Sequence, residues 1–292
     1  MKSHVTATRL MFASILVCAA TSTLAARPAL ADSPPQHDHL ALAQFYIDDI
    51  DPGSSGDNSY GGDFGTSDPP RLATVPDSIF FSEPHHTESR TRCGSFLALL
   101  LKQAHPSLDE GDNGGDVLFH MAGSTSPSAS VWHDAIELEA SYDEPNDGLS
   151  NPYYFERRLS VGQIQPGDIL AAEYSNSSPA SSGDVTGHAM LVESIHIKAA
   201  GEDGGPSLLG TVQYIVSVID SSSGIHGMDD TRNVSPWGNG NSGIGQGTIV
   251  LYRDLLTGVF SGWTWSVNAS VVYTQSQRHM VAGRLHGPAT GL

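Results

Sequence analysis

The sequence predicts an α+β fold in which an early helix packs on an antiparallel sheet. Apolar residues first recur at helical spacing, with Leu97, Leu100 and Leu101 on one face. Later segments are short runs rich in valine and isoleucine, separated by turn-forming glycine, proline and aspartate. Helices that precede strands along the chain are typical of α+β domains with antiparallel sheets.

Two helices are expected from their end signals. The first covers residues 93–104, takes Ser89 or Thr91 as its cap, and ends before Pro106. Ser126 and Pro127 open the second, because serine caps helices well and proline is tolerated at the first helical position. The second helix falls in a helical insertion near residues 110–150, within a main domain that spans residues 89–292.

The strands are expected in the second half of the chain. They cover residues 169–174, 188–195, 214–220, 248–252 and 263–267. The turn Gln165-Pro-Gly-Asp168 leads into the first, and Asp168 is expected to shape that turn. The glycine-rich residues 202–206 form the hairpin turn between the second and third strands.

The N-terminal region reads as a leader followed by an arm. Residues 1–31 have the features of a secretory leader, with the basic Lys2 and Arg9 followed by a short apolar stretch. Small residues end this segment, and cleavage is predicted after Ala31. The apolar stretch is shorter than the roughly 20 residues of a membrane span. We therefore expect a secreted or periplasmic protein, with no membrane attachment after leader removal. Residues 32–88 are rich in glycine and aspartate and predict a partly disordered arm, with a short strand at residues 44–47.

The net charge of the chain limits the kinds of molecule that we expect it to bind. The chain has 14 basic and 32 acidic residues, for a net charge of −18. Such a field repels phosphate backbones, so we expect no nucleic-acid partner. Residues 243–247 look like a phosphate loop but do not join a strand to a helix, so we expect a loop that lines a cleft. The paired histidines near residues 37–39 and 85–86 lack further ligands, so we expect neither a metal nor another cofactor.

One cysteine, Cys93, remains once the leader with Cys18 is removed. Cysteines of exported proteins usually pair as disulfides, so a lone one is either a small buried hydrophobe or a nucleophile. Cys93 begins the first predicted helix, where unpaired N–H groups and the helix dipole favour a thiolate. This position favours the nucleophile.

A base and its orienting group come from the predicted hairpin. A turn centred on Gly204 places His188 directly opposite Asp220, within reach of an imidazole–carboxylate contact unless a bulge shifts the register. An imidazole oriented by a carboxylate acts as a general base. We therefore predict Cys93 as nucleophile, His188 as base and then acid, and Asp220 as the orienting group. His226, a short loop beyond Asp220, is the alternative third member.

Gln165-Pro-Gly-Asp-Ile-Leu170 and Thr186-Gly-His-Ala-Met-Leu-Val192 resemble the NlpC-type branch of papain-like cysteine peptidases. Residues 218–232 and Gly243-Ile-Gly-Gln-Gly-Thr248 also resemble an uncharacterised group of exported bacterial proteins with this core. The resemblance implies a papain-like core with a nucleophile helix on an antiparallel sheet. It also implies hydrolysis of an amide or peptide bond by Cys–His–Asp acyl transfer, often in cell-wall peptidoglycan, without a metal. The chain departs from this family in one respect: an upstream tyrosine often assists the site, but the nearest upstream tyrosine here is Tyr60.

Two alternatives to hydrolysis stay open. A non-catalytic binding or structural module on the same fold would keep Cys93 buried and inert. An acyl or amide transferase would use the same triad with an acceptor other than water. In the enzymatic readings, the expected partner is a peptide or a peptidoglycan-like substrate.

Overall fold

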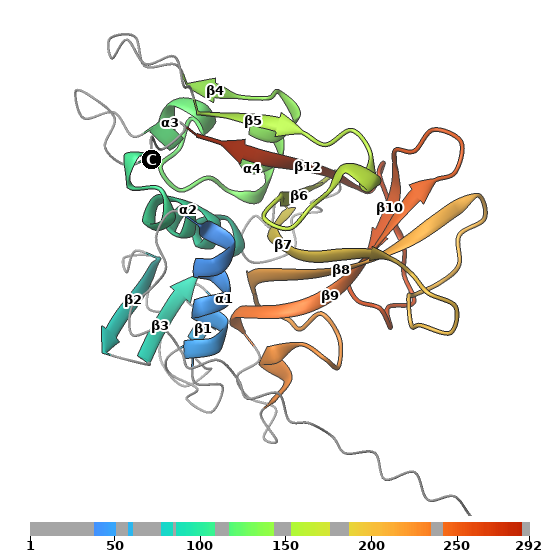
Figure 1. The fold of residues 1–292 in the computed structure, drawn as a ribbon, viewed down its shortest axis with the longest axis horizontal. Helices are drawn as coiled ribbons and strands as arrows, with labels where there is room; N and C mark the ends of the chain where they lie inside the picture. The colour runs from blue at the N-terminus through green and yellow to red at the C-terminus, as the bar shows by residue number, and fades with distance from the viewer. Residues whose placement is uncertain are drawn as a thin grey trace, which may run out of the picture.

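The fold is an α+β arrangement, as the order of elements predicts. The computed structural model describes residues 38–50, 58–60, 77–83, 86–108, 117–142, 153–175, 187–234 and 242–287. Within these ranges, a few helices from the first half of the chain pack on a nine-stranded antiparallel sheet (Figure 1). The predicted leader, residues 1–31, lies outside the described residues.

The large sheet has the order β11-β10-β9-β8-β7-β6-β12-β5-β4. Its strands are β4 (Ser141–Tyr142), β5 (Tyr153–Arg157), β6 (Ile169–Tyr174), β7 (Gly187–Ile197), β8 (Thr211–Ser222), β9 (Gly243–Asp254), β10 (Phe260–Thr264), β11 (Tyr273–Thr274) and β12 (Arg278–His286). The last strand, β12, lies between β6 and β5. The chain thus returns from the far edge of the sheet to its interior.

Four α-helices are described, two of them at the predicted places. They are α1 (His39–Asp49), α2 (Cys93–Ala104), α3 (Val117–Ala122) and α4 (Ala129–Glu137), with 3-10 turns η1 (Pro106–Leu108), η2 (Val161–Gln163) and η3 (Thr231–Val234). The helix predicted at residues 93–104 is confirmed, although its cap is Arg92, whose N–H donates to the Ser95 hydroxyl at 2.9 Å. The second predicted helix starts two residues late, because Ser128 caps α4.

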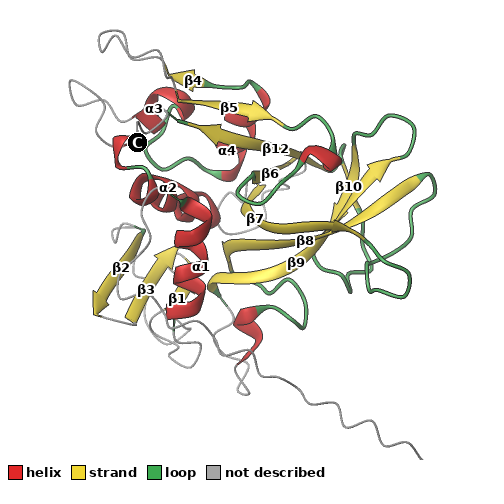
Figure 2. Cartoon of the chain, in the orientation of Figure 1, coloured by secondary structure: helices red, strands yellow, loops and turns green. Residues whose placement is uncertain are grey.

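The arm contributes structure that the sequence pattern did not predict. Residues 44–47 lie in helix α1, so the expected strand there is wrong. Asp38 caps α1 through its carboxylate, and Leu42 and Tyr46, one turn apart, are fully buried. A small second sheet, in the order β1-β3-β2, lies beside α1 and joins β1 (Asn58–Tyr60), β2 (Ser78–Glu83) and β3 (His86–Thr91) (Figure 2).

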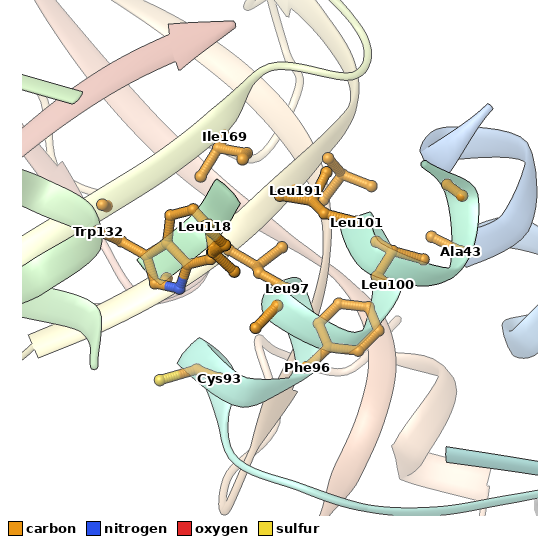
Figure 3. Close-up of a cluster of buried hydrophobic side chains, with 14 of the residues drawn as sticks. Ala43, Cys93, Phe96, Leu97, Leu100, Leu101, Leu118, Trp132, Ile169 and Leu191 are labelled. Carbon is orange, nitrogen blue, oxygen red and sulfur yellow. The ribbon is translucent and has the colours of Figure 1, made fainter. Parts of the chain in front are cut away.

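The helix face of the sheet carries the larger apolar core. Leu97 and Leu101 of α2 pack there with Trp132 of α4 and with Ile169 and Leu191 of the sheet (Figure 3). These side chains are fully buried. Burial of a leucine-sized side chain stabilises a fold by about 1.5–3 kcal/mol. The contact between α2 and the sheet therefore fixes where the first turn of α2 lies.

The β7–β8 register differs from the predicted one. The sequence places His188 opposite Asp220, but Leu191 pairs with Ile219, which by continuation puts Asp220 opposite Met190. The prediction of direct opposition is therefore wrong by two residues.

Two local features shift this register. Ile197 pairs with Tyr214, so the hairpin turn is centred beyond Gly204. A bulge at Glu193 then moves the pairing back by one residue. The net shift beyond the bulge is even, so His188 and Asp220 stay on the same face of the sheet. His188 and Asp220 remain diagonal neighbours, which are still within reach of long side chains.

None of the described helices has the length and apolar character that crossing a membrane requires.

Candidate active site

Cys93 lies at the first turn of α2, and hydrogen bonds fix the backbone on both sides of it. It is 6% exposed. The Ser221 hydroxyl donates to the Thr91 carbonyl oxygen at 2.7 Å, which ties β8 to the residues before the helix. The Trp132 indole N–H donates to the Gly94 carbonyl oxygen at 3.0 Å, which ties α4 to the residue after Cys93. Figure 3 shows the sulfur directed away from the leucines of α2.

The environment of Cys93 favours the thiolate. Burial raises the pKa of the thiol, but the charge of His188, a hydrogen bond from its imidazole and an N–H from Ala189 bring this pKa below its ordinary value. Burial also lowers the pKa of His188, but the charge of Cys93 and the hydrogen bonds to Asp220 and Cys93 raise it to about 9. The two shifts run in the directions that favour a thiolate beside an imidazolium.

Asp220 orients His188. The imidazole Nε2–H donates to Asp220 Oδ2 at 2.5 Å, and the Asp220 side chain is fully buried. With Nε2 engaged, Nδ1 is the nitrogen that remains for the sulfur of Cys93. His188 thus lies next to both Cys93 and Asp220.

His226 lies behind Asp220 and does not take its place. Its Nε2 lies 2.9 Å from Asp220 Oδ2 and its Nδ1 lies 2.8 Å from the Trp265 carbonyl oxygen. Both ring nitrogens of His226 thus have an oxygen partner, the Asp220 carboxylate on one side and the Trp265 carbonyl on the other. The alternative third member therefore supports Asp220 instead of replacing it.

Arg232 completes the surroundings of Asp220. Its guanidinium lies 3.0 Å from Asp220 Oδ1 as an ion pair, and it also binds Asp230 at 2.7 Å and 2.8 Å. Burial raises the pKa of Asp220, but Arg232 and His226 hold it well below its usual range. Asp230 also accepts the backbone N–H of His226 at 2.7 Å. The buried Arg232 guanidinium thus pairs with two buried carboxylates, Asp220 and Asp230, which offsets part of the large cost of desolvating these charges.

Trp265 forms an aromatic wall over both imidazoles. Its ring centroid lies 4.2 Å from that of His226, in a stacked geometry, and 4.8 Å from that of His188. Its indole N–H donates to the Ile225 carbonyl oxygen at 2.9 Å, which fixes the ring. An indole face next to an imidazolium adds a cation–π attraction. The sequence places Trp265 inside a strand, whereas β10 ends at Thr264.

Tyr60 reaches the site from the arm. Its hydroxyl hydrogen-bonds to Cys93, and burial together with the charge of Cys93 raises the pKa of Tyr60, so it stays a donor. Strand β1 places it there, because Tyr60 pairs with Thr91 next to the helix start. The Asn58 side chain also binds the backbone N–H and carbonyl of Ile244, at 2.8 Å and 2.7 Å. Sequence reasoning did not assign Tyr60 to the site, and the tyrosine that often assists the site in the resembled family was the one available signal.

A Tyr60→Phe substitution is expected to slow alkylation of Cys93 at pH 6 about tenfold or more. A hydrogen bond to a charged group contributes about 1.5–3 kcal/mol, and this one favours the thiolate. The check is the rate of iodoacetamide labelling across pH, with Tyr174→Phe as the matched control. Tyr174 is also buried and feels the charge of Cys93 without bonding to it. Equal rates in both variants would contradict the role given to Tyr60.

Asp168 stays outside this cluster, as expected. It accepts the Gln165 N–H at 2.8 Å, which closes the turn before β6. Arg158 at 3.2 Å and Arg284 at 2.7 Å pair with its two carboxylate oxygens. Asp168 is thus a buried turn-shaping residue with its own cations.

The histidine pairs near residues 37–39 and 85–86 fall only partly within the described residues. His39 binds the Gly167 carbonyl oxygen and the ring of His105, and no metal-ligating group within the described ranges includes it. His37 and His85 lie outside the described residues.

No family model, curated protein or solved structure matches this chain. Inference about function therefore depends on the geometry around Cys93. That geometry places a buried thiol at a helix start beside an imidazole that is hydrogen-bonded to a buried carboxylate.

Proposed function

We propose that this protein is an exported cysteine hydrolase of the NlpC-type, papain-like kind, which cleaves an amide or peptide bond. The observation that carries the proposal is the continuous chain of hydrogen bonds from Cys93 through His188 to Asp220. A cysteine that served only as a buried hydrophobe would have a raised thiol pKa, whereas that of Cys93 is lowered. Peptidoglycan stem peptides are the substrate class we would test first.

The reaction follows from the positions of the groups. The Cys93 thiolate attacks the carbonyl carbon, and the negative charge moves to the carbonyl oxygen. The first N–H groups of a helix have no intrahelical partner, so the Cys93 N–H is a candidate donor to that oxygen. His188 gives its Nδ1 proton to the leaving amine, which leaves an acyl-enzyme. His188 then takes a proton from water, and the resulting hydroxide releases the acid and restores the thiolate–imidazolium pair.

Thiol labelling tests the catalytic pair without a known substrate. Wild-type Cys93 is expected to react with iodoacetamide at pH 6.5 at least about tenfold faster than a small free thiol, whose pKa is about 8.5. His188→Ala should remove this advantage. Labelling should fall as the pH drops through the lowered thiol pKa, and the ion pair should be lost as the pH rises through about 9.

The matched control for this test is His196→Ala. His196 is an exposed histidine that also binds a carboxylate, Glu202, at 2.8 Å. Its loss should leave the labelling rate unchanged. If His188→Ala also leaves the rate unchanged, Cys93 is an inert thiol and the non-catalytic module becomes the better reading.

Substrate digestion separates hydrolysis from transfer. Peptidoglycan fragments and peptide amides would be incubated with wild-type protein and with Cys93→Ala, with and without an added amine acceptor. Release of a new carboxylate by the wild type alone supports hydrolysis. A product that contains the amine in preference to water would instead support an acyl transferase.

A further inference from the structure

A second group of histidine and carboxylate side chains lies outside the proposed active site. It consists of His133 and Glu137 on α4 and His279 on β12, and we call it the His133–Glu137–His279 cluster. The facing nitrogens His133 Nε2 and His279 Nδ1 are 2.8 Å apart. Glu137 Oε2 lies 3.7 Å from the first and 3.9 Å from the second. Three potential ligand atoms thus converge on one point.

The fold builds this convergence from three elements. His133 and Glu137 are four residues apart on α4, so they share one face of the helix. Helix α4 packs against β6, β7 and β12. On the sheet, His279 pairs with Glu173 of β6, which also lies close to His133. A further carboxylate, that of Glu173, is therefore next to the cluster.

Neighbouring groups hold the ligand atoms in place. His133 Nδ1 lies 3.1 Å from Asp134 Oδ1, so Nδ1–H donates there and the Nε2 lone pair faces the cluster. The other oxygen of Glu137 binds Arg157 at 3.2 Å, which turns Oε2 toward the imidazoles. A metal-binding histidine is typically oriented by a carboxylate on its second nitrogen in this way. Such support distinguishes a built site from a chance group of polar side chains.

We propose that the His133–Glu137–His279 cluster binds a divalent transition metal, with Zn²⁺ as the best fit. Ligand bonds of about 2.0–2.2 Å in a tetrahedron place nitrogen and oxygen ligands about 3.3–3.5 Å apart, close to the separations here. Two imidazoles and one carboxylate are ligands that Zn²⁺ accepts. The His133 side chain is 2% exposed, whereas those of Glu137 and His279 are 33% and 38% exposed. The site is therefore closed on one side and reachable from solvent on the other.

Metal binding would clamp α4 onto the sheet. The cluster joins the helix to β12, the strand that returns to the sheet interior late in the chain. Glu173 pairs with Gly187 on β7, directly before His188. Strand β6 thus separates the clamp on β12 from the proposed base on β7, and this inference does not depend on the proposed hydrolase activity.

The experiment titrates the full chain with Co²⁺ and Zn²⁺ in a Cys93→Ser background, which removes the competing thiolate. We expect one equivalent of Co²⁺ to give a visible d–d spectrum without thiolate charge-transfer absorption, and Zn²⁺ to displace it. His279→Ala should abolish binding. Asp134→Asn should weaken it about 10- to 100-fold, as loss of a supporting carboxylate does at known sites. His196→Ala, an exposed histidine next to a carboxylate, should change nothing.

Two outcomes would overturn the proposal. The first is the absence of stoichiometric binding in folded protein, which would make the 2.8 Å contact a simple imidazole–imidazole hydrogen bond. The second is binding that survives His279→Ala and is lost in His226→Ala, which would place the metal at His188, Asp220 and His226. His279→Gln serves as a second variant if the alanine variant does not fold by circular dichroism.

Discussion

Asp220→Asn is expected to lower the free energy of unfolding by about 3–5 kcal/mol and to remove the reactivity of Cys93. The substitution keeps the size of the side chain but deletes its charge. His226 and Arg232 then remain buried, with one carboxylate, Asp230, in place of two. Removing one partner of a buried ion pair typically costs this much, because the other charge cannot return to water.

The pH dependence gives a second signature of the same residue. Asp220 has a folded pKa well below its unfolded value of about 3.9. Its contribution to stability is therefore present above that unfolded value and is lost as the pH falls through the folded one. His188, with a pKa raised to about 9, contributes fully below its unfolded value of about 6.5 and loses its contribution as the pH rises through 9. Asp220→Asn should flatten the acid side of the stability profile.

Asp168→Asn is the matched control. Asp168 is equally buried and also pairs with two cations, Arg158 and Arg284. Its asparagine variant should lose comparable stability in urea unfolding, while Cys93 in the remaining folded protein should label at the wild-type rate. If both variants label alike, Asp220 is a structural carboxylate and orients no base.

The proximity of Cys93, His188 and Asp220 was predictable, because it depends on features that small errors in register do not change. The position of Cys93 depends only on where the first predicted helix begins, and α2 begins at Cys93 as predicted. His188 and Asp220 needed only the same sheet face, which an even register shift preserves. An odd shift would have separated them, and neither the turn centre nor the Glu193 bulge can be read from residue types alone.

The supporting groups were not predictable in the same way. Tyr60 lies in a glycine-rich segment whose composition predicts disorder, and only the parallel pairing of β1 with β3 brings it to Cys93. His279 lies far from His133 in sequence, and β12 joins them by returning between β6 and β5. Such contacts depend on long-range topology, which local periodicity does not encode. The spacing of His133 and Glu137, four residues apart on a helix, could have indicated two of the three residues of the His133–Glu137–His279 cluster.

The glycine-rich residues 243–247 show how a local pattern can be misread. They form the first half of β9 and are not the expected loop. Gly243, Gly245 and Gly247 alternate along the strand, and Gly245 pairs directly with Asp220. They therefore lie on the face that carries the buried charges. Because glycine has no side chain, Gly245 and Gly247 leave room for Arg232, His226 and Asp230.

Gly245→Ala and Gly247→Ala are each expected to destabilise the protein by about 1–3 kcal/mol or more, the usual cost of overpacking a core. A Cβ at 245 would lie 2.3–2.6 Å from Nε, Cδ and Cγ of Arg232. A Cβ at 247 would lie 2.5 Å from His226 Cβ and 2.6 Å from Asp230 Oδ2. These neighbours cannot move aside, because hydrogen bonds hold both charged side chains.

Gly224→Ala gives the opposite expectation and serves as the control. It lies in the loop after β8, has a φ outside the left-handed region, and its Cβ would meet nothing within 4 Å. Alanine there should be neutral or stabilise by about 0.4–1 kcal/mol, because it restricts the unfolded chain. Urea unfolding and iodoacetamide labelling of the three variants check the prediction together. Destabilisation with slower labelling at 245 and 247, but not at 224, would show that the glycines make room for the charges behind Asp220. Equal behaviour of all three would mean that the cluster can repack around an added methyl group, and that its geometry does not set the reactivity of Cys93.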